Sequence, residues 1–177
     1  MNWHEYFTYD PETGNLIWKE RPRSHFANDR SHKRGNTMYT NRVAGFVCLA
    51  YLLVEVRGVN RQAHRVIWEM HHGPIPKGID IDHIDGNGRN NLIANLRLAT
   101  RAENSINRRT RSDNTSGCKG VSWHSRDERW VAYISINKKF KELGRFKNYE
   151  DAVRARTEAS AMHYGEFARE EGVRSPR

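Results

Sequence analysis

Residues 79–109 restrict the fold more than any other stretch, because several kinds of local signal follow one another there. Residues 79–83 (IDIDH) alternate apolar and polar side chains, which is the pattern of a half-buried strand. Residues 86–91 (GNGRNN) are rich in turn-forming residues, and residues 96–98 (LRL) predict a second short strand. The pattern therefore predicts two strands joined by a polar loop.

A helix is predicted to follow the second strand directly. Thr100 and Glu103 have the spacing of a capping box, with threonine at the N-cap and glutamate at the third helical position. Asn104 then falls in the first turn of this helix. Beyond it, residues 108–116 (RRTRSDNTS) are almost free of apolar side chains, which is typical of a linker between domains.

The charge of the chain narrows the class of partner. The 177 residues carry a formal net charge of +9, with a pI near 9.8, which favours nucleic acid or a membrane surface. The longest apolar stretch, Val43 to Val56, is interrupted by Gly45 and Glu55 and is shorter than the ~20 residues that a membrane span needs. It is predicted to be a buried strand pair, and no membrane partner is expected.

Cysteine usage and the N-terminus point to a reducing compartment. Cys48 and Cys118 have no C-x-x-C partner, which argues against a structural zinc site and a disulfide scaffold. Residues 2–5 do not resemble the start of a secretory signal, so we expect a cytoplasmic location, in the host cell if the chain is phage-encoded. Residues 20–42 are polar without periodicity and are predicted to be a long loop. His64 is expected to be a structural residue rather than a catalytic one.

The polar residues of the two-strand segment suit phosphodiester hydrolysis. The attacking water needs a base, and histidine has the most suitable pKa near pH 7, which favours His83. The leaving oxygen needs a hard cation with oxygen ligands, and Asp82 and the amide oxygen of Asn104 could supply two of them. Asp82 and His83 are neighbours in a strand and therefore point to opposite faces.

This set of residues resembles the HNH motif of phage and intron-encoded homing endonucleases. The matching segments are 82–87 (DHIDGN), 90–92 (NNL), 95–97 (NLR) and Asn104. The resemblance implies a ββα-metal finger with His83 as general base, Asp82 as metal ligand and Asn95 as the residue that orients the base. Asn104 corresponds to the last metal ligand, which is histidine in some members and asparagine in others. The implied cofactor is Mg²⁺, for which Mn²⁺ can substitute.

Three strand patterns and one helix pattern follow the linker. The strands are predicted over residues 120–123, 130–136 and 140–146. Asn148 can cap a helix over residues 149–164, which Gly165 would end. Residues 118–147 contain eight Lys/Arg against three Asp/Glu, together with two tryptophans. This composition suits contact with base edges and phosphates of DNA.

The same region resembles the Apetala/ethylene-response-factor type of DNA-binding domain. The matching segments are 120–123 (GVSW), 129–134 (RWVAYI), 143–146 (LGRF) and 150–152 (EDA). That family places a three-stranded antiparallel sheet, supported by one helix, in the major groove. The positions that match its DNA-facing residues are Trp123, Arg126, Arg129, Tyr133 and Lys141. Ser122 and Glu142 replace the arginine and tryptophan usual in the plant domains, so the base preference of those domains is not carried over.

The sequence thus predicts an α+β protein: an HNH nuclease finger on a small mixed N-terminal part (1–110), a linker (111–116), a sheet-type DNA-binding domain (117–168) and a polar tail (169–177). Further DNA contacts, mostly to phosphates, are predicted for Arg97, Arg101, Arg108 and Arg109. The expected function is metal-dependent, site-specific cleavage of double-stranded DNA by a monomer or weak dimer, in a phage or mobile-element homing endonuclease. Two alternatives stay open: a DNA-binding regulator with an inactive nuclease domain, and an HNH restriction or packaging nuclease of low specificity.

Overall fold

The computed structural model describes residues 1–108, 110, 113–136 and 138–168, which divide into two compact units, Met1–Arg101 and Ala102–Arg177. The predicted domain boundary after residue 110 stays a prediction, and both the tail at 169–177 and part of the linker lie outside the described residues. Within the second unit, Lys119 Nζ donates to the carbonyl oxygens of Ser105 and Ile106, which precede that predicted boundary. None of the helices in the described part of the chain is long and apolar enough to cross a membrane.

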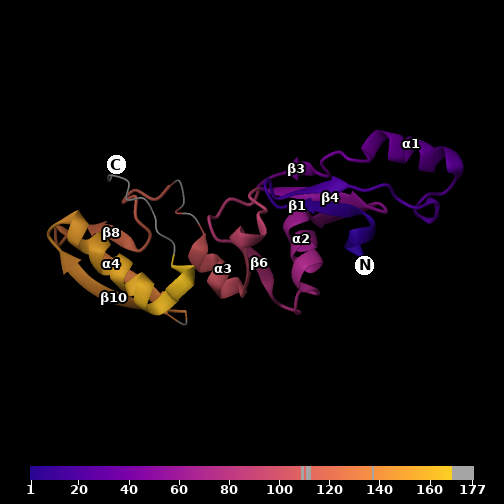
Figure 1. The fold of residues 1–177 in the computed structure, drawn as a ribbon. Coiled ribbons are helices and arrows are strands. Elements are labelled where there is room, and N and C mark those ends of the chain that lie inside the picture. Colours follow the sequence, from indigo (N-terminus) through magenta and orange to yellow (C-terminus); the bar gives the residue numbers. More distant parts are fainter. Residues whose placement is uncertain (109, 111–112, 137, 169–177) are drawn as a thin grey trace. The chain divides into compact units, whose positions relative to one another are not determined.

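The first unit consists of short elements joined by tight turns (Figure 1). In chain order they are the 3-10 helix η1 (Trp3–Glu5), β1 (Phe7–Asp10), β2 (Asn15–Trp18), η2 (Arg23–His25), α1 (Asp29–Tyr39), β3 (Phe46–Cys48), β4 (Tyr51–Val56), β5 (Val59–Gln62), α2 (Ala63–His72), β6 (Asp80–His83), η3 (Ile93–Asn95) and β7 (Leu96–Ala99). β1 pairs with β2 and β6 with β7, while β3, β4 and β5 form a three-stranded sheet; all pairs are antiparallel. The predicted pair of strands around a polar loop is confirmed as β6 and β7.

The core of the first unit forms where α2 packs on one face of the sheet that contains β4. Val54 and Ile67 are fully buried there, together with side chains from η1, β1 and β2. The prediction of a buried strand pair at Val43 to Val56 was therefore only half right. Strands form, but Phe46, Val47 and above all Leu49 (90% exposed) lie outside the core, because β3 is an edge strand of its sheet and Leu49 lies in the turn after it.

The prediction of a loop over residues 20–42 was wrong, because α1 lies within it. The helix begins at a capping box: the Asn28 side chain accepts from the Ser31 amide, and the Ser31 hydroxyl accepts from the Asn28 amide. None of its residues is buried. Hydrophobic periodicity could not reveal this helix, because it has no apolar face.

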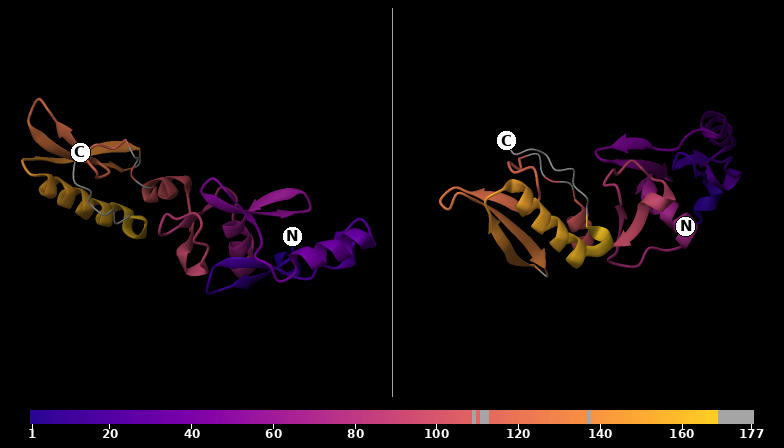
Figure 2. Two further views of the ribbon diagram at one scale, coloured as in Figure 1. Left: turned by 90° about the horizontal axis from the view of Figure 1, so that it is seen from above. Right: turned by 60° about the vertical axis from the view of Figure 1, so that its left-hand side comes forward.

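The second unit contains the predicted three-stranded sheet and helix. Its elements are α3 (Arg101–Asn107), which starts at the unit boundary, β8 (Val121–His124), β9 (Arg129–Ile136), β10 (Lys139–Phe146), α4 (Tyr149–Tyr164) and η4 (Gly165–Phe167). The sheet is antiparallel in the order β10-β9-β8, and α4 lies along one of its faces (Figure 2). A separate core forms between them from Val121, Ala132, Ala152 and Val153. As predicted, a helix begins directly after Thr100.

Candidate active site

A buried aspartate and a partly buried arginine face each other across the β6–β7 hairpin. The strand register places Asp82 directly opposite Arg97, so their side chains share one face of the hairpin. Arg97 Nε and Nη2 both donate to Asp82 Oδ2, at 3.0 and 2.9 Å. The guanidinium thus supplies a counter-charge to a carboxylate that is only 5% exposed. The predicted DNA contact of Arg97 stays a prediction, but the structure gives this side chain a partner within the chain.

His83 is held by an asparagine that the motif comparison did not single out. The ring is 5% exposed, and its Nε2 lies 3.0 Å from Oδ1 of Asn91, which is itself 2% exposed. An amide oxygen can only accept, so Nε2 carries the hydrogen and the neutral ring has its lone pair on Nδ1. Nδ1 is then the nitrogen that can take a proton. The sequence places Asn91 only in a turn-rich loop, where several asparagines are equivalent.

Asn95 closes the base of the loop between β6 and β7. Its Oδ1 accepts from the Asp85 amide at 3.0 Å, while its Nδ2 donates to Asp85 Oδ1 at 3.0 Å and to the Asn90 carbonyl at 2.8 Å. Its own carbonyl accepts from the amide of Ile84, the residue after His83. Among the described residues Asn95 has no direct bond to the imidazole, so its predicted orienting role would act through this loop.

The Asp85 carboxylate accepts several hydrogen bonds from the loop, and they lower its pKa. Partial burial raises its pKa, but hydrogen bonds from the Asn90 side chain, the Asn87 amide and the Asn95 side chain outweigh burial, and the net shift is downward. The ionised carboxylate therefore accepts several hydrogen bonds inside the loop. Polar groups of the loop itself therefore help to hold its shape.

The turn between β1 and β2 supports the same loop from outside. The Tyr9 hydroxyl oxygen accepts from the Ile93 amide at 2.9 Å. Gly14 has a φ of +71°, and a Cβ on it would lie 2.6 Å from the Leu92 nitrogen and 2.7 Å from the Asn91 carbonyl carbon. Only glycine fits this close approach of two backbones.

His64 packs against His83 from the first turn of α2. The ring centroids lie 4.9 Å apart in an edge-on arrangement, and Tyr51 contacts both rings. Burial lowers the pKa of His64 to about 3, with smaller contributions from the charges of His83 and Arg65. His64 is 3% exposed, and its Nδ1 has no hydrogen-bond partner among the described residues. It is neutral near pH 7, as suits the structural residue that the sequence predicts.

Acid should therefore destabilise the protein before its carboxylates titrate. The unfolded state binds a proton on His64 near pH 6.5, whereas the folded state resists protonation down to about pH 3. The contribution to stability is complete above about pH 6.5 and is lost below it, at about 1.4 kcal/mol per pH unit. We expect the free energy of unfolding, measured in urea at several pH values, to fall between pH ~6.5 and ~5. His64→Gln should flatten this slope, and an equal slope in both proteins would contradict the assignment.

The residues predicted to hold a metal have oxygen donors of the appropriate kind. Asp82 lies near the end of β6, and Asn104 lies in α3 of the second unit, partly exposed. A carboxylate and an amide oxygen are hard donors that suit Mg²⁺. The described residues contain no cluster of three or more His, Cys, Asp or Glu that could hold an ion. A site of this composition would hold a metal weakly until further oxygens, such as those of a phosphate, complete it.

The strand register separates the predicted DNA-facing residues of the second unit. Trp123 stands opposite Trp130, with ring centroids 5.2 Å apart, and Lys141 stands opposite the buried Ile134. Trp123 and Lys141 therefore share the face on which α4 lies. Arg129 alternates with the buried positions of β9 and lies on the other face, which we call the open face of the sheet.

The remaining predicted contacts lie at several places. Tyr133 is on the open face, where its ring contacts Phe140. Arg126 is exposed in the turn between β8 and β9, and the exposed arginines of or beside α3 are Arg101 and Arg108. Arg109 lies outside the described residues. The DNA-contacting role of all of these side chains stays a prediction.

Residues 61–106 match the model of a family described as HNH endonuclease. The match runs from β5 through α2 and the β6–β7 hairpin into α3, and it includes Asp82, His83, Asn95 and Asn104. It does not extend to β8–β10 and α4. No solved structure matches the chain significantly.

Two viral proteins are similar to parts of the chain. Protein 3.8 of Escherichia phage T7 is 50% identical over 76 residues, which cover 43% of this chain and 63% of the phage protein. An uncharacterized HNH endonuclease of Acanthamoeba polyphaga mimivirus is 35% identical over 108 residues, which cover 60% of this chain and 55% of the mimivirus protein. The chain therefore spans somewhat more than half the length of these relatives.

Proposed function

We propose that the chain is a metal-dependent DNA endonuclease whose active site is the β6–β7 hairpin and its loop. The observation that carries this proposal is the hydrogen bond between His83 Nε2 and the Asn91 amide oxygen, one residue after a buried carboxylate, which supports a base at Nδ1. The match of residues 61–106 to the HNH endonuclease model supports it independently.

His83 takes the proton from the attacking water at Nδ1, while Asn91 keeps Nε2 protonated. Asp82 and Asn104 would hold the divalent ion, Mg²⁺ or Mn²⁺. When bound, this ion supplies charge neutralisation at the scissile phosphate and at the leaving oxygen. Asn95 keeps the loop closed around Asp85, so that His83 stays at a fixed position relative to the phosphate. The products are a 5′-phosphate and a 3′-hydroxyl.

The cleavage is proposed to be site-specific, as in the phage and mobile-element homing endonucleases that the motif resembles. The test is run-off mapping of both strands after full-length protein and Mg²⁺ are added to a long phage or host DNA. Cuts at few positions, abolished by EDTA, are expected. Cuts at many positions would favour a restriction or packaging nuclease, and intact DNA would favour a regulator with an inactive nuclease domain.

The second unit is proposed to bind DNA through the open face of its sheet. Arg129 and Tyr133 lie on this face, and Arg126 lies in the turn beside it. A three-stranded antiparallel sheet supported by one helix is the architecture that the Apetala/ethylene-response-factor resemblance implies, and β-sheets can read the major groove. Arg145 lies on the same face, but it forms ion pairs with Glu142 and Asp127. Its charge is therefore partly neutralised within the protein, and Arg129 is the better candidate for a phosphate contact.

Two substitutions that remove one positive charge each test this assignment. Arg129→Ala should weaken DNA binding and lower the slope of log affinity against log salt by about 0.9, because one phosphate contact is lost. Lys141 was also matched to a DNA-facing position, but it lies on the α4 side of the sheet, so under the open-face proposal Lys141→Ala should leave the slope nearly unchanged. The measurement is a binding isotherm in EDTA at several salt concentrations. Equal losses from both variants would show that the open face is not the contact surface.

A further inference from the structure

Helix α1 is a polar helix with one anchored face. Asn36 uses both ends of its amide on a single residue: its Nδ2 donates to the Arg21 carbonyl at 2.9 Å, and its Oδ1 accepts from the Arg21 amide at 3.1 Å. His32 Nε2 also lies 3.0 Å from the Arg21 carbonyl. A Cβ on Gly35 would lie 2.6 Å from the Phe26 ring, so the helix passes close to the preceding segment.

The Arg21 side chain fixes this anchored face to the core of the first unit. Its guanidinium lies 4.5 Å from the ring centroid of Trp18, 4.7 Å from that of Phe26 and 5.8 Å from that of Tyr39. Trp18 belongs to β2 and is buried in the hydrophobic core. Cation–π contacts at a partly buried site of this kind hold a helix in place without an apolar helix face.

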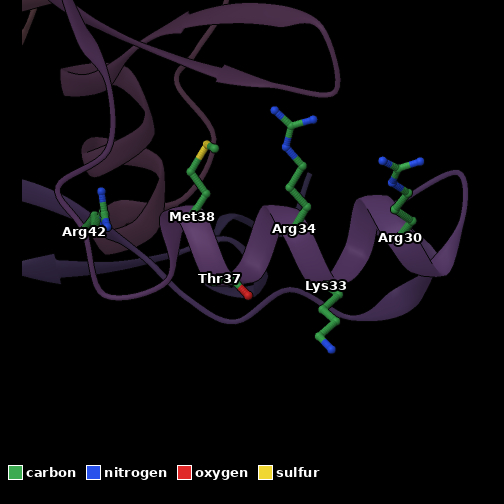
Figure 3. A pocket seen from close by; sticks show the side chains of 6 residues that line it. All are labelled: Arg30, Lys33, Arg34, Thr37, Met38 and Arg42. Atoms are coloured by element: carbon green, nitrogen blue, oxygen red, sulfur yellow. The ribbon is translucent and has the colours of Figure 1, made fainter.

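The opposite face of α1 is cationic and open. Arg30, Lys33 and Arg34 are exposed, and with Thr37, Met38 and Arg42 they line a hollow of about 600 Å³ (Figure 3). Figure 3 shows Arg30 and Arg34, one helical turn apart, extending from the same side of the helix. We call the residues Arg30, Lys33, Arg34 and Arg42 the α1 basic face.

No carboxylate within the described part of the chain neutralises this face. None of its four cationic side chains has an ion pair or a hydrogen bond there. The one acid of the helix, Asp29, is engaged by Arg23 instead. Four cations around one hollow repel each other, and an anionic partner would relieve this repulsion.

We propose that the α1 basic face binds the phosphate backbone of duplex DNA. This inference rests on the proposed function, which makes DNA the substrate, and adds a contact surface in the nuclease unit itself. Arginines one turn apart on a helix lie about 5–6 Å apart at Cβ, a spacing that lets them reach neighbouring phosphates of one strand. A membrane surface is disfavoured, because an interfacial helix needs a continuous apolar face, and the only large apolar side chains of α1 are Met38 and Tyr39 at its C-terminal end.

The test compares two double variants at the same positions of the full-length protein. Arg30→Ala/Arg34→Ala removes two charges and keeps a good helix former, whereas Arg30→Lys/Arg34→Lys keeps both charges and serves as the matched control. Binding to a short duplex is measured in EDTA at several salt concentrations. Circular dichroism checks that both variants are folded.

The alanine variant should bind more weakly and lose about 1.8 from the slope of log affinity against log salt, which corresponds to two phosphate contacts. Its deficit against the parent should shrink about tenfold between about 50 mM and about 200 mM salt. The lysine variant should keep the parental slope. A parental slope in the alanine variant, or a loss of binding to phosphatidylserine vesicles but not to DNA, would overturn the proposal.

This measurement is independent of catalysis, because EDTA prevents metal-dependent cleavage. A protein that binds through α1 but never cleaves would reject the proposed nuclease and leave the α1 assignment standing. If the protein cleaves DNA but the alanine variant keeps the parental slope, the α1 assignment is rejected and the proposed nuclease stands.

Discussion

Replacing His83 by alanine is expected to slow DNA cleavage by about 10²–10⁴-fold while DNA affinity changes little, because a general base lowers the barrier without contributing much to ground-state binding. The Nδ1 of His83 is the proposed proton acceptor, and its neighbour Asn91 cannot replace it, since an amide has no comparable basicity. The measurement is the single-turnover rate of plasmid cleavage at saturating protein, paired with a binding isotherm in EDTA.

The matched control is His72→Ala, which removes an exposed imidazole at the end of α2, outside the hairpin. It should cleave at the parental rate. The role assigned to His83 is untenable if His83→Ala retains more than roughly a tenth of the parental rate, since a base contributes far more than that.

Removing the Asp82 carboxylate should abolish cleavage in both Mg²⁺ and Mn²⁺. It should also destabilise the fold by about 3–5 kcal/mol, because the Arg97 cation loses its carboxylate partner in a mostly buried place. The Asp82→Ala variant alone therefore cannot separate a lost metal ligand from a weakened protein. Cleavage rate and the urea midpoint need to be measured together.

The double variant Asp82→Ala/Arg97→Met separates these two effects. With both charges gone, the hairpin no longer holds an arginine without its carboxylate partner, and much of the lost stability should return. Cleavage should remain absent, since the oxygen donor is still missing. A double variant that cleaves at near the parental rate would show that Asp82 does not hold the metal.

The hairpin and the C-terminal sheet could be predicted because their signals are local. Alternating residues gave β6, the Thr100 capping position gave the start of α3, and Asn148 with Gly165 bounded α4. Each of these patterns depends on residues a few positions apart.

Other parts depended on contacts that no local pattern encodes. Helix α1 has no apolar period, and its only signal was the pair Asn28 and Ser31. The Asp82–Arg97 pair depends on strand register, which a long intervening loop leaves open. The choice of Asn91 as the partner of His83 depends on how that loop folds.

The contact between Gly14 and the backbone at Asn91 and Leu92 limits how far the catalytic motif can be moved between proteins. The hydrogen bond from Ile93 to the Tyr9 hydroxyl joins residues 84 positions apart, and Tyr9 lies well outside the matched stretch 61–106. A chimera that transplants only that stretch would carry His83, the proposed base, without the residues that support its loop. A graft that also includes residues 7–18 keeps the contacts of Tyr9 and Gly14 with the loop. The segment that must be transferred is therefore discontinuous in sequence.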